Sequence, residues 1–269
     1  MKKIIYHDKC PDGFGAAYIA YTALTLREEE DVRFVPMKFG VWEEDVVEEG
    51  DTVFIFDINF APDELLCWYD KAESIELFDH HEHAYNLKNM PFPVTIDNDE
   101  CGMSLAYKRF FPEYLHPRIV NYVKDRDLWQ WKMPESRAVS AYISSFPFDF
   151  HVWEEIEYKL DYEFHTVVRE GNAILRYTDR IVDELCAMGS EDRLFGYDVP
   201  VVNSPVLQSE IGNRLLDYYP DAPFSAVYHV LKNGNKKFSL RSADDRLDVG
   251  RIAKELGGGG HRNAAGLVI

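Results

Sequence analysis

The stretch LFDHHEHA, residues 77–84, places Asp79, His80, His81 and His83 within five consecutive positions. The apolar run before them predicts a buried strand, so these side chains stand at the carboxyl end of that strand. Imidazole and carboxylate groups bind divalent cations and act as general acids and bases. A solvated loop is the alternative, and the other segments of the chain must decide between the two.

Three other segments carry the same side-chain types at the ends of predicted elements. His7 ends a strand, and Asp12 stands at the start of a helix entered through glycines, which leave room for a ligand to approach. Asp57 directly follows four apolar strand residues in VFIFDIN, where a carboxylate is costly to bury unless it is paired or bound to a metal. Asp125 lies in VKDRDLW, within a predicted helical segment.

Taken singly, these carboxylates have simpler explanations. Asp12 fits a helix N-cap worth about 1 kcal/mol, Asp57 a strand-end cap, and Asp125 a solvated acidic pair with Asp127. Taken together, the imidazoles and carboxylates form a mixed nitrogen and oxygen set, which suits Mn²⁺ or Mg²⁺ better than a structural zinc. One carboxylate that bridges two ions about 3.5–4 Å apart would generate a metal-bound hydroxide for in-line attack on phosphorus.

The C-terminal stretch LGGGGHRNAAG, residues 256–266, is the second strong signal. Its four consecutive glycines predict bare backbone N–H groups that form an anion nest, to which His261 adds a donor. A flexible tail loop is the alternative, but the small residues after His261 argue against disorder. Upstream, FSLRS alternates like a strand and presents Arg241, whose guanidinium fits a phosphate or a nucleobase edge. A surface salt bridge is the common alternative for this arginine.

The first half of the chain alternates short apolar strands with helical segments. The predicted strands and helices are 4–6, 13–28, 32–39, 52–58, 62–69 and the strand that enters FDHHEHA. This alternation predicts an α/β domain over residues 1–150 with a doubly wound, mainly parallel sheet. Active sites of such folds lie beyond the carboxyl ends of the strands. His7, Asp57 and Asp79 each end a strand and are therefore expected at one edge.

The second half predicts a helical connector and a smaller domain. Long helices between 153 and 188 are interpreted as a connector over residues 151–190. Strands around 199–202, 224–231 and 237–241, with helices over 206–218 and 249–256, predict an α/β domain over residues 191–269. Gly257 ends the last of these helices.

Composition restricts the partners. A formal charge of −18 argues against long nucleic acid, because phosphate neutralisation needs a basic face. No apolar run approaches the roughly 20 residues of a membrane span, and the chain enters a strand without an apolar signal segment. Four scattered cysteines fit reduced thiols. We therefore expect a cytoplasmic protein with a small phosphate-bearing substrate and no membrane contact. The sequence does not determine the oligomeric state.

These motifs together resemble a known family. Asp79-His80-His81 is similar to the motif that names the DHH phosphoesterase superfamily, and GGGGHRNAAG with FSLRS is similar to the DHH-associated substrate-binding domain of its oligoribonuclease-like branch. YHDKCPDGFGAA, Asp57 and Asp125 resemble the first, second and fourth motifs. The motifs follow one another in the expected order along the whole chain. The resemblance implies a two-domain enzyme that binds two Mn²⁺ ions between its domains, with Mg²⁺ or Co²⁺ as substitutes.

The resemblance also implies a role for each matched residue of the metal centre. Asp57 would bridge the two ions, and His7 would belong to the first site. The residues that would complete the other site are Asp12, His80 and Asp125. Asp125 is preferred to Asp127 because Trp129 follows it at the spacing of the family pattern.

The remaining matched residues would handle the substrate. His81 would contact the scissile phosphate, and Asp79 would support the site from behind the ligands. The residues that would hold the rest of the substrate are Arg241, Gly258, Gly259, Gly260 and His261. His83 matches no family position and is interpreted as a solvated or supporting residue.

One position departs from the pattern. Many superfamily members have a further aspartate just before the residue that matches Asp12, whereas this chain has Cys10-Pro11. Three explanations stay open: Cys10 ligates as a softer donor, Asp8 reaches into the site, or the first metal site is weakened.

The leading prediction is a manganese-dependent phosphodiesterase that hydrolyses short oligonucleotides or dinucleotides to mononucleotides. The same centre would suit hydrolysis of cyclic nucleotides or cyclic dinucleotides, a 3′-phosphoadenosine phosphate phosphatase, or an exopolyphosphatase. Polyphosphate would favour an extended Lys/Arg track, and no such cluster stands out in the sequence. The alternative of another class is a nucleotide-binding regulatory protein with a weakened metal site, which the Cys10 departure motivates.

Overall fold

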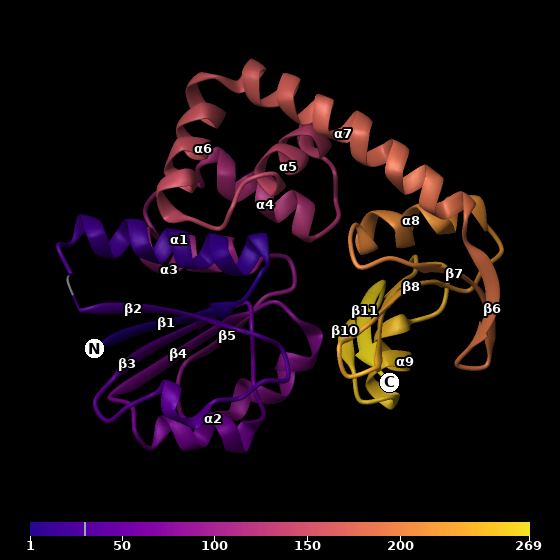
Figure 1. Ribbon diagram of the computed structural model, residues 1–269. Coiled ribbons are helices and arrows are strands. Elements are labelled where there is room, and N and C mark those ends of the chain that lie inside the picture. The colour runs from indigo at the N-terminus through magenta and orange to yellow at the C-terminus, as the bar shows by residue number, and fades with distance from the viewer. Residues whose placement is uncertain (30) are drawn as a thin grey trace. The chain divides into compact units, whose positions relative to one another are not determined.

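The computed structural model describes residues 1–29 and 31–269; the side chains of Glu82 and His83 are outside the described set. The chain divides into two compact units, Met1–Leu175 and Arg176–Ile269 (Figure 1). The division falls within the stretch that the sequence predicts as a connector. The expected domain limits at residues 150 and 190 stay predictions.

The first unit is built on a five-stranded parallel sheet with the order β2-β1-β3-β4-β5. Its strands are β1 (Lys2–His7), β2 (Val32–Met37), β3 (Thr52–Phe56), β4 (Ser74–Asp79) and β5 (Val94–Ile96). All five carboxyl ends share one edge, and the chain changes winding direction between β1 and β3. Ligands of doubly wound sheets bind at such a switch point. The predicted fold class is confirmed.

Helices cover both faces of this sheet (Figure 1). One core is formed with α1 (Pro11–Leu26), α3 (Gly102–Phe110), α4 (Arg118–Asp127), α5 (Ser136–Ser144) and α6 (Phe150–Tyr162). The other is formed with α2 (Pro62–Tyr69) and the 3-10 segments η1 (Glu44–Val46) and η2 (Glu82–Asn89). Neighbouring strand residues alternate between them, with Ile4 in the first core and Ile5 in the second. Because both faces are covered, the middle residues of β1 and β3 are apolar on both sides of the sheet.

The second unit contains a six-stranded sheet with the order β10-β11-β9-β8-β7-β6. The strands are β6 (Ser190–Leu194), β7 (Tyr197–Asn203), β8 (Ser225–Val230), β9 (Lys236–Arg241), β10 (Gly259–His261) and β11 (Ala264–Val268). β7 and β8 run parallel, and the other neighbouring strands run antiparallel.

Two helices and the end of a third pack on that sheet. α8 (Gln208–Tyr218) shares a core with Val182 of α7 (Phe164–Ala187), and α9 (Val249–Glu255) shares another with Phe238. Within the described residues, no helix combines the length and the apolar composition that crossing a membrane requires.

A buried ion pair joins the amino ends of β1 and β3. The Lys3 side chain is fully buried, and its Nζ lies 2.7 Å from Oδ2 of Asp51 and 2.8 Å from the carbonyl oxygen of Val46. The exposed carboxylate of Glu48 lies 3.2 Å from the same Nζ. Burial opposes the charged form of Asp51, but Lys3 and the N–H of Glu48 outweigh it and lower the pKa of Asp51. The pair therefore stabilises the edge of the sheet opposite His7.

We expect Asp51→Asn to lower the free energy of unfolding by about 3 kcal/mol, because it leaves the buried Lys3 charge without its main partner. Urea unfolding at neutral pH measures the loss. Glu48→Gln, which removes the exposed partner of the same lysine, is the control and should cost less than about 1 kcal/mol. Equal losses of unfolding free energy in the two variants would contradict the assignment of Asp51 as the main partner of Lys3.

The difference between wild type and Asp51→Asn should shrink below about pH 4. A carboxylate whose pKa is lowered by folding stabilises the protein above its unfolded pKa, and this contribution is lost as the pH falls through the folded value.

Candidate active site

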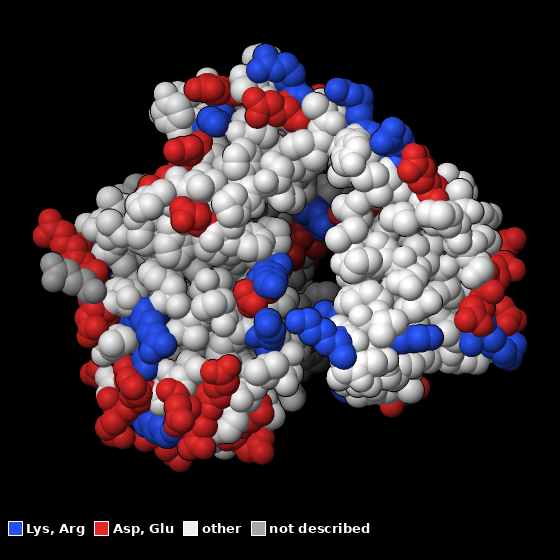
Figure 2. All heavy atoms as spheres, viewed as in Figure 1, with Lys and Arg blue, Asp and Glu red and all other residues white. Residues whose placement is uncertain are grey.

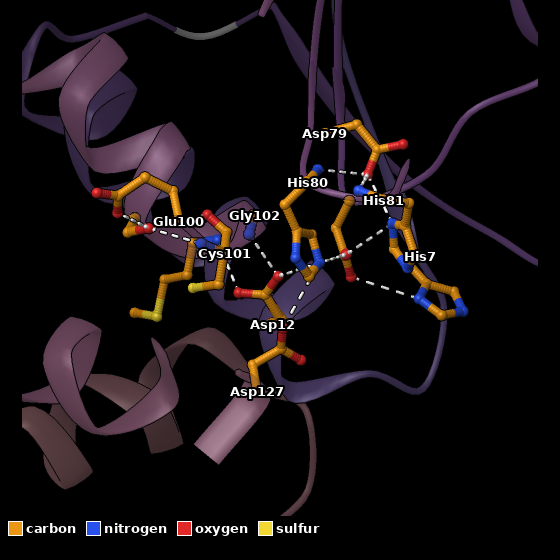
Figure 3. Close-up of polar contacts among 12 residues, drawn as sticks. His7, Asp12, Asp79, His80, His81, Glu100, Cys101, Gly102 and Asp127 are labelled. Atoms are coloured by element: carbon orange, nitrogen blue, oxygen red, sulfur yellow. Dashed lines mark hydrogen bonds and ion pairs between the residues drawn. The ribbon is translucent and has the colours of Figure 1, made fainter. Parts of the chain in front are cut away.

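Side chains from β1, α1, the end of β4 and the end of α4 meet in one cluster (Figure 3). The cluster includes Asp57, which follows β3 and lies beside His7 and His80. Oδ1 of Asp57 lies 3.2 Å from Nε2 of His80, and its Oδ2 lies 3.3 Å from Nδ1 of His7. The residue is only 1% exposed. The sequence-predicted bridging carboxylate is thus placed between the histidines that end β1 and follow β4.

The backbone of Asp57 is in the left-handed region, with φ at +58°. Few residues other than glycine adopt this conformation, and such strained positions collect at functional sites. The backbone N–H of Asp57 donates to the carbonyl oxygen of Phe78 at 3.0 Å, which ties this turn to β4.

Asp12 and Asp127 lie on the other side of His80. Nε2 of His80 is 3.8 Å from Oδ2 of Asp12 and 3.5 Å from Oδ2 of Asp127. Asp12 does not cap its own helix, since Cys10 is the N-cap residue of α1. Instead, its buried carboxylate accepts hydrogen bonds from the backbone N–H groups of Gly102 and Met103, at the start of α3.

Close backbone approach explains why glycines surround the site. A Cβ on Gly102 would lie 2.6 Å from Cβ of Asp57 and 2.8 Å from Oδ2 of Asp12, so α3 reaches both carboxylates only through a glycine. A Cβ on Gly13 would lie 2.5 Å from the carbonyl oxygen of His7. Gly13, which the sequence predicts to leave room for a ligand, instead leaves room for the backbone of His7. Gly102 was not identified from the sequence.

The structure places the predicted ligand Asp125 outside the cluster around Asp57. Its carboxylate accepts hydrogen bonds from the N–H of Lys132 at 2.9 Å, the N–H of Met133 at 3.3 Å and the hydroxyl of Ser136 at 2.5 Å. It holds the segment after α4, away from the cluster, while Asp127 takes the place beside His80. Residues two apart on a helix point to different sides, so only one of the two aspartates could face the site.

The described residues supply several overlapping groups of potential ligand atoms, and within each group the atoms lie within 4.8 Å of one another. Asp57, Asp79, His80 and His81 form one such group, and two others share no residue. The first of these two groups is His7, Cys10 and Asp57, and the second is Asp12, His80 and Asp127. Among the residues that the structure describes, Asp8 belongs to neither group. Of the two residues expected to complete the first site, Cys10 therefore lies among potential ligand atoms and Asp8 does not.

Asp79 is fully buried and orients His81. Its Oδ1 accepts hydrogen bonds from Nδ1 of His81 at 2.6 Å and from the backbone N–H of His80 at 2.7 Å. Its Oδ2 accepts a hydrogen bond from the Asn59 side chain. Asn59 is a further residue that the sequence did not single out. His83 cannot be placed, because its side chain lies outside the described set.

The carboxylates of the cluster shift one another's protonation. Burial and the charges of Asp57 and Asp127 raise the pKa of Asp12 well above its usual range. Burial opposes the charged form of His80, but the hydrogen bond to Asp57 and the nearby carboxylates raise its pKa to about 10. Burial and the charges of Asp57, Asp127 and Asp12 also raise the pKa of the Cys10 thiol well above its usual range. The negative charge of the cluster therefore favours the binding of protons or cations.

These residues fit a divalent metal centre. Burial disfavours the charged form of Asp57, but His7 and His80 outweigh it and hold the pKa of Asp57 far below its usual range. Within the described residues, its buried Oδ2 nevertheless accepts no hydrogen bond. A cation among imidazole and carboxylate donors would satisfy this oxygen and replace the protons that the cluster otherwise holds.

The second unit places Arg241 against α8. Its guanidinium donates to the hydroxyl of Ser209 at 2.6 Å and to the carbonyl oxygen of Leu240 at 2.8 Å. Arg241 is in register with Ala264 of β11, which in turn is in register with His261 of β10. The predicted substrate residues Arg241 and His261 therefore belong to one row of the same sheet.

The glycine run differs from the expected anion nest. The N–H of Gly258 donates to the carbonyl oxygen of Ala253 at 2.7 Å, and Gly259, Gly260 and His261 form strand β10 against β11. A Cβ on Gly258 would lie 2.2 Å from the carbonyl oxygen of Gly266. A Cβ on Gly260 would lie 2.4 Å from the carbonyl oxygen of Ala264, so Gly258 and Gly260 are the glycines required for close packing of the β-hairpin. The expected series of bare N–H groups is not formed at Gly258.

Comparison with known sequences identifies relatives of this chain. A family model of the DHHA1 domain matches residues 207–269. The uncharacterized protein R106 of Acanthamoeba polyphaga mimivirus is 29% identical over 99% of this chain and 67% of its own length. The oligoribonuclease NrnB of Bacillus subtilis is 26% identical over 81% of this chain and 59% of NrnB, so the match spans less than two thirds of that relative.

Solved structures share the fold at low sequence identity. An exopolyphosphatase-related protein from Bacteroides fragilis has a TM-score of 0.53 at 14% identity, covering 99% of this chain and 86% of that one. RecJ from Thermus thermophilus in complex with Mn²⁺ has a TM-score of 0.52 at 13% identity, covering 100% and 49%. The pGpG-specific phosphodiesterase PggH from Vibrio cholerae has a TM-score of 0.50 at 14% identity, covering 100% and 92%.

The resemblance inferred from the sequence motifs is confirmed by the DHHA1 match, by the NrnB relative and by the shared fold. Residues 207–269 match the DHHA1 domain, and the chain as a whole is similar to proteins of the DHH phosphoesterase superfamily.

Proposed function

We propose that this protein is a metal-dependent phosphodiesterase that hydrolyses dinucleotides or short oligonucleotides to mononucleotides. The observation that carries the proposal is the position of Asp57, whose two carboxylate oxygens lie 3.2 Å from His80 and 3.3 Å from His7. His7 and His80 belong to different ligand groups. One buried carboxylate therefore has an oxygen near each group, as a bridging ligand of two cations requires.

Bound divalent cations would act as Lewis acids and activate water for attack on phosphorus. In this proposal His7, Cys10 and Asp57 would hold the first cation, and Asp12, Asp57, His80 and Asp127 would hold the second. The N–H groups of Gly102 and Met103 fix the Asp12 carboxylate, so that it is oriented before a cation binds.

His81 would bind the scissile phosphate. Its Nδ1 lies 2.6 Å from Oδ1 of Asp79, which holds the ring in one orientation and leaves Nε2 to meet a phosphate oxygen. Arg241, held by Ser209, would bind another part of the substrate.

The acidic surface of the protein and its similarity to NrnB support a short nucleotide as the substrate. NrnB is by name an oligoribonuclease. On the face shown in Figure 2, Asp and Glu crowd the part of the first unit around α2, which is unfavourable for a long polyanion. The mainly carboxylate and imidazole ligands favour Mn²⁺, with Mg²⁺ or Co²⁺ as substitutes. A cytoplasmic location remains a prediction from the sequence.

An exposed aromatic side chain beside the cluster also favours a nucleoside. The ring of Phe39 is 43% exposed, and its centroid lies 5.9 Å from that of His7 and 5.7 Å from that of His81. Bases of single-stranded nucleotides stack on such rings. Polyphosphate has no group that would use this ring.

The proposal is tested by incubating the protein with Mn²⁺ and, separately, dinucleotides, cyclic nucleotides, 3′-phosphoadenosine phosphate and polyphosphate. We expect mononucleotides from the dinucleotides. Asp57→Asn should lower kcat/KM by more than about a hundredfold, the scale for losing one group that stabilises the transition state. Asp45→Asn, at an exposed position of the same unit, is the matched control. Turnover of polyphosphate alone would refute the assignment.

Substitutions of Asp127 and Asp125 should affect different properties, the first Mn²⁺ affinity and the second the free energy of unfolding. Asp127→Asn removes a proposed ligand and should weaken Mn²⁺ binding by at least about tenfold, as measured by calorimetry. Asp125→Asn should leave Mn²⁺ affinity near wild type and cost about 1–3 kcal/mol of unfolding free energy, because Ser136 and two N–H groups lose a charged acceptor. The reverse pattern would restore Asp125 as the ligand.

Phe39→Leu should raise KM for a dinucleotide by about tenfold, since stacking is worth ~1–3 kcal/mol per base. A ribose phosphodiester without a base should be cleaved equally well by both proteins. Phe39→Trp keeps a stacking surface and should retain the wild-type KM. Equal effects of Phe39→Leu on both substrates would mean that Phe39 only supports the histidines.

A further inference from the structure

A turn after β1 holds Cys10 at the cluster. The N–H of Asp8 donates to the carbonyl oxygen of Met37 at 2.8 Å, and Lys9 has a left-handed φ of +56°. The carbonyl oxygen of Cys10 then accepts the N–H of Phe14 at 2.9 Å, in the first turn of α1. Because hydrogen bonds fix the turn on both sides, the partly exposed Cys10 is placed beside His7 by the backbone.

The thiol of Cys10 converges with two other ligand atoms. Its Sγ, a ring nitrogen of His7 and a carboxylate oxygen of Asp57 all lie within 4.8 Å of one another. This spacing suits three donors that surround one ion, because metal–ligand bonds of sulfur, nitrogen and oxygen are about 2.0–2.3 Å long.

A second observation points to a cation at this place. Oδ2 of Asp57 is buried and, among the described residues, accepts no hydrogen bond; Nδ1 of His7 lies 3.3 Å away. A buried carboxylate oxygen without a hydrogen-bond donor is costly. A cation bound by His7 and Cys10 would remove that cost.

We propose that His7, Cys10 and Asp57 form a thiolate, imidazole and carboxylate site that takes a borderline cation, Zn²⁺, Co²⁺ or Fe²⁺, in preference to Mn²⁺ or Mg²⁺. Thiolate and imidazole favour these softer ions, whereas carboxylate and water favour Mn²⁺ and Mg²⁺. As the metal–sulfur bond forms, the S–H bond breaks and its proton passes to solvent. The inference rests on the proposed function, since it names the occupant of one of its two metal positions.

The second ligand group has no sulfur donor. Asp12, His80 and Asp127 offer two carboxylates and one imidazole, which suit Mn²⁺. The two positions of the centre are therefore chemically unlike, and the protein should bind two different metals when both are supplied.

Cobalt provides a direct measurement of the sulfur ligand. A thiolate bound to Co²⁺ gives a charge-transfer absorption in the near ultraviolet, which oxygen and nitrogen ligands do not. We expect this band when the metal-free full chain is titrated with Co²⁺. Cys10→Ser should abolish it and weaken Co²⁺ binding at this position by at least ~10–100-fold, the loss known for removing even an outer partner of a ligand.

The other cysteines provide matched controls. Cys101 is the N-cap residue of α3 and lies beside Asp12, so it is the other thiol that could bind Co²⁺ at this centre. Cys67 lies on α2, 3.7 Å from the Glu44 carboxylate. The band should persist in Cys101→Ser and in Cys67→Ser, and circular dichroism should show that each variant folds. Loss of the band in Cys101→Ser with retention in Cys10→Ser would overturn the proposal.

Metal competition tests the preference itself. Wild-type protein dialysed against equimolar Mn²⁺ and Co²⁺ should retain both metals, as measured by elemental analysis. Cys10→Asp restores an oxygen donor and should shift the retained metal towards Mn²⁺ by at least about tenfold. Retention of Mn²⁺ alone by wild type, or the absence of the absorption band, would refute the thiolate site.

The two proposals fail in different ways. A wild-type protein that shows the cobalt–thiolate band but cleaves no dinucleotide would refute the phosphodiesterase proposal and retain the Cys10 ligand. A protein that cleaves dinucleotides with Mn²⁺ but shows no cobalt–thiolate band would support the phosphodiesterase proposal and refute Cys10 as a ligand.

Discussion

The buried negative charge around Asp57 is the constraint on which the rest of this site depends. Asp12, Asp57 and Asp127 bring three carboxylates within 4 Å of the single imidazole of His80. Such a concentration of like charge in a buried place is unfavourable without a compensating cation. The raised pKa of Asp12 and of His80 is the response of the protein to that field when protons are the only compensation.

The fold provides this arrangement through the ends of its parallel strands and the start of one helix. His7, Asp57 and His80 follow β1, β3 and β4, whose carboxyl ends lie at one edge of the sheet. The amino end of α3 then comes close enough for two N–H groups to bind Asp12, which also places the positive end of the helix dipole there. Gly102 makes that approach sterically possible.

The ligand groups on the two sides of Asp57 differ in chemistry. One contains the Cys10 thiol and the His7 imidazole, and the other contains two carboxylates with His80. A centre with unlike positions can divide its work, since a softer cation can be retained firmly while a harder, more weakly held cation exchanges with solvent and substrate. In the second unit, the guanidinium of Arg241 is held by Ser209 and the carbonyl oxygen of Leu240, and such a group suits an anion.

The fold class of the first unit and most of the residues that gather at this edge of its sheet could be predicted from the sequence alone. Strands that are covered on both faces are continuously apolar, so a polar residue such as His7, Asp57 or His80 marks the point where a strand ends. Parallel connection then places these ends together. Family motifs in order along the chain were sufficient to identify the superfamily.

Which of Asp125 and Asp127 lies beside His80 depends on the tertiary structure, because spacing along a sequence does not tell which side of a helix faces a distant strand. It also revealed the contributions of Gly102 and Asn59, whose roles depend on contacts with residues far away in the chain. Local patterns determine where elements begin and end, whereas the rotation of a helix and the approach of its backbone are set by packing between elements.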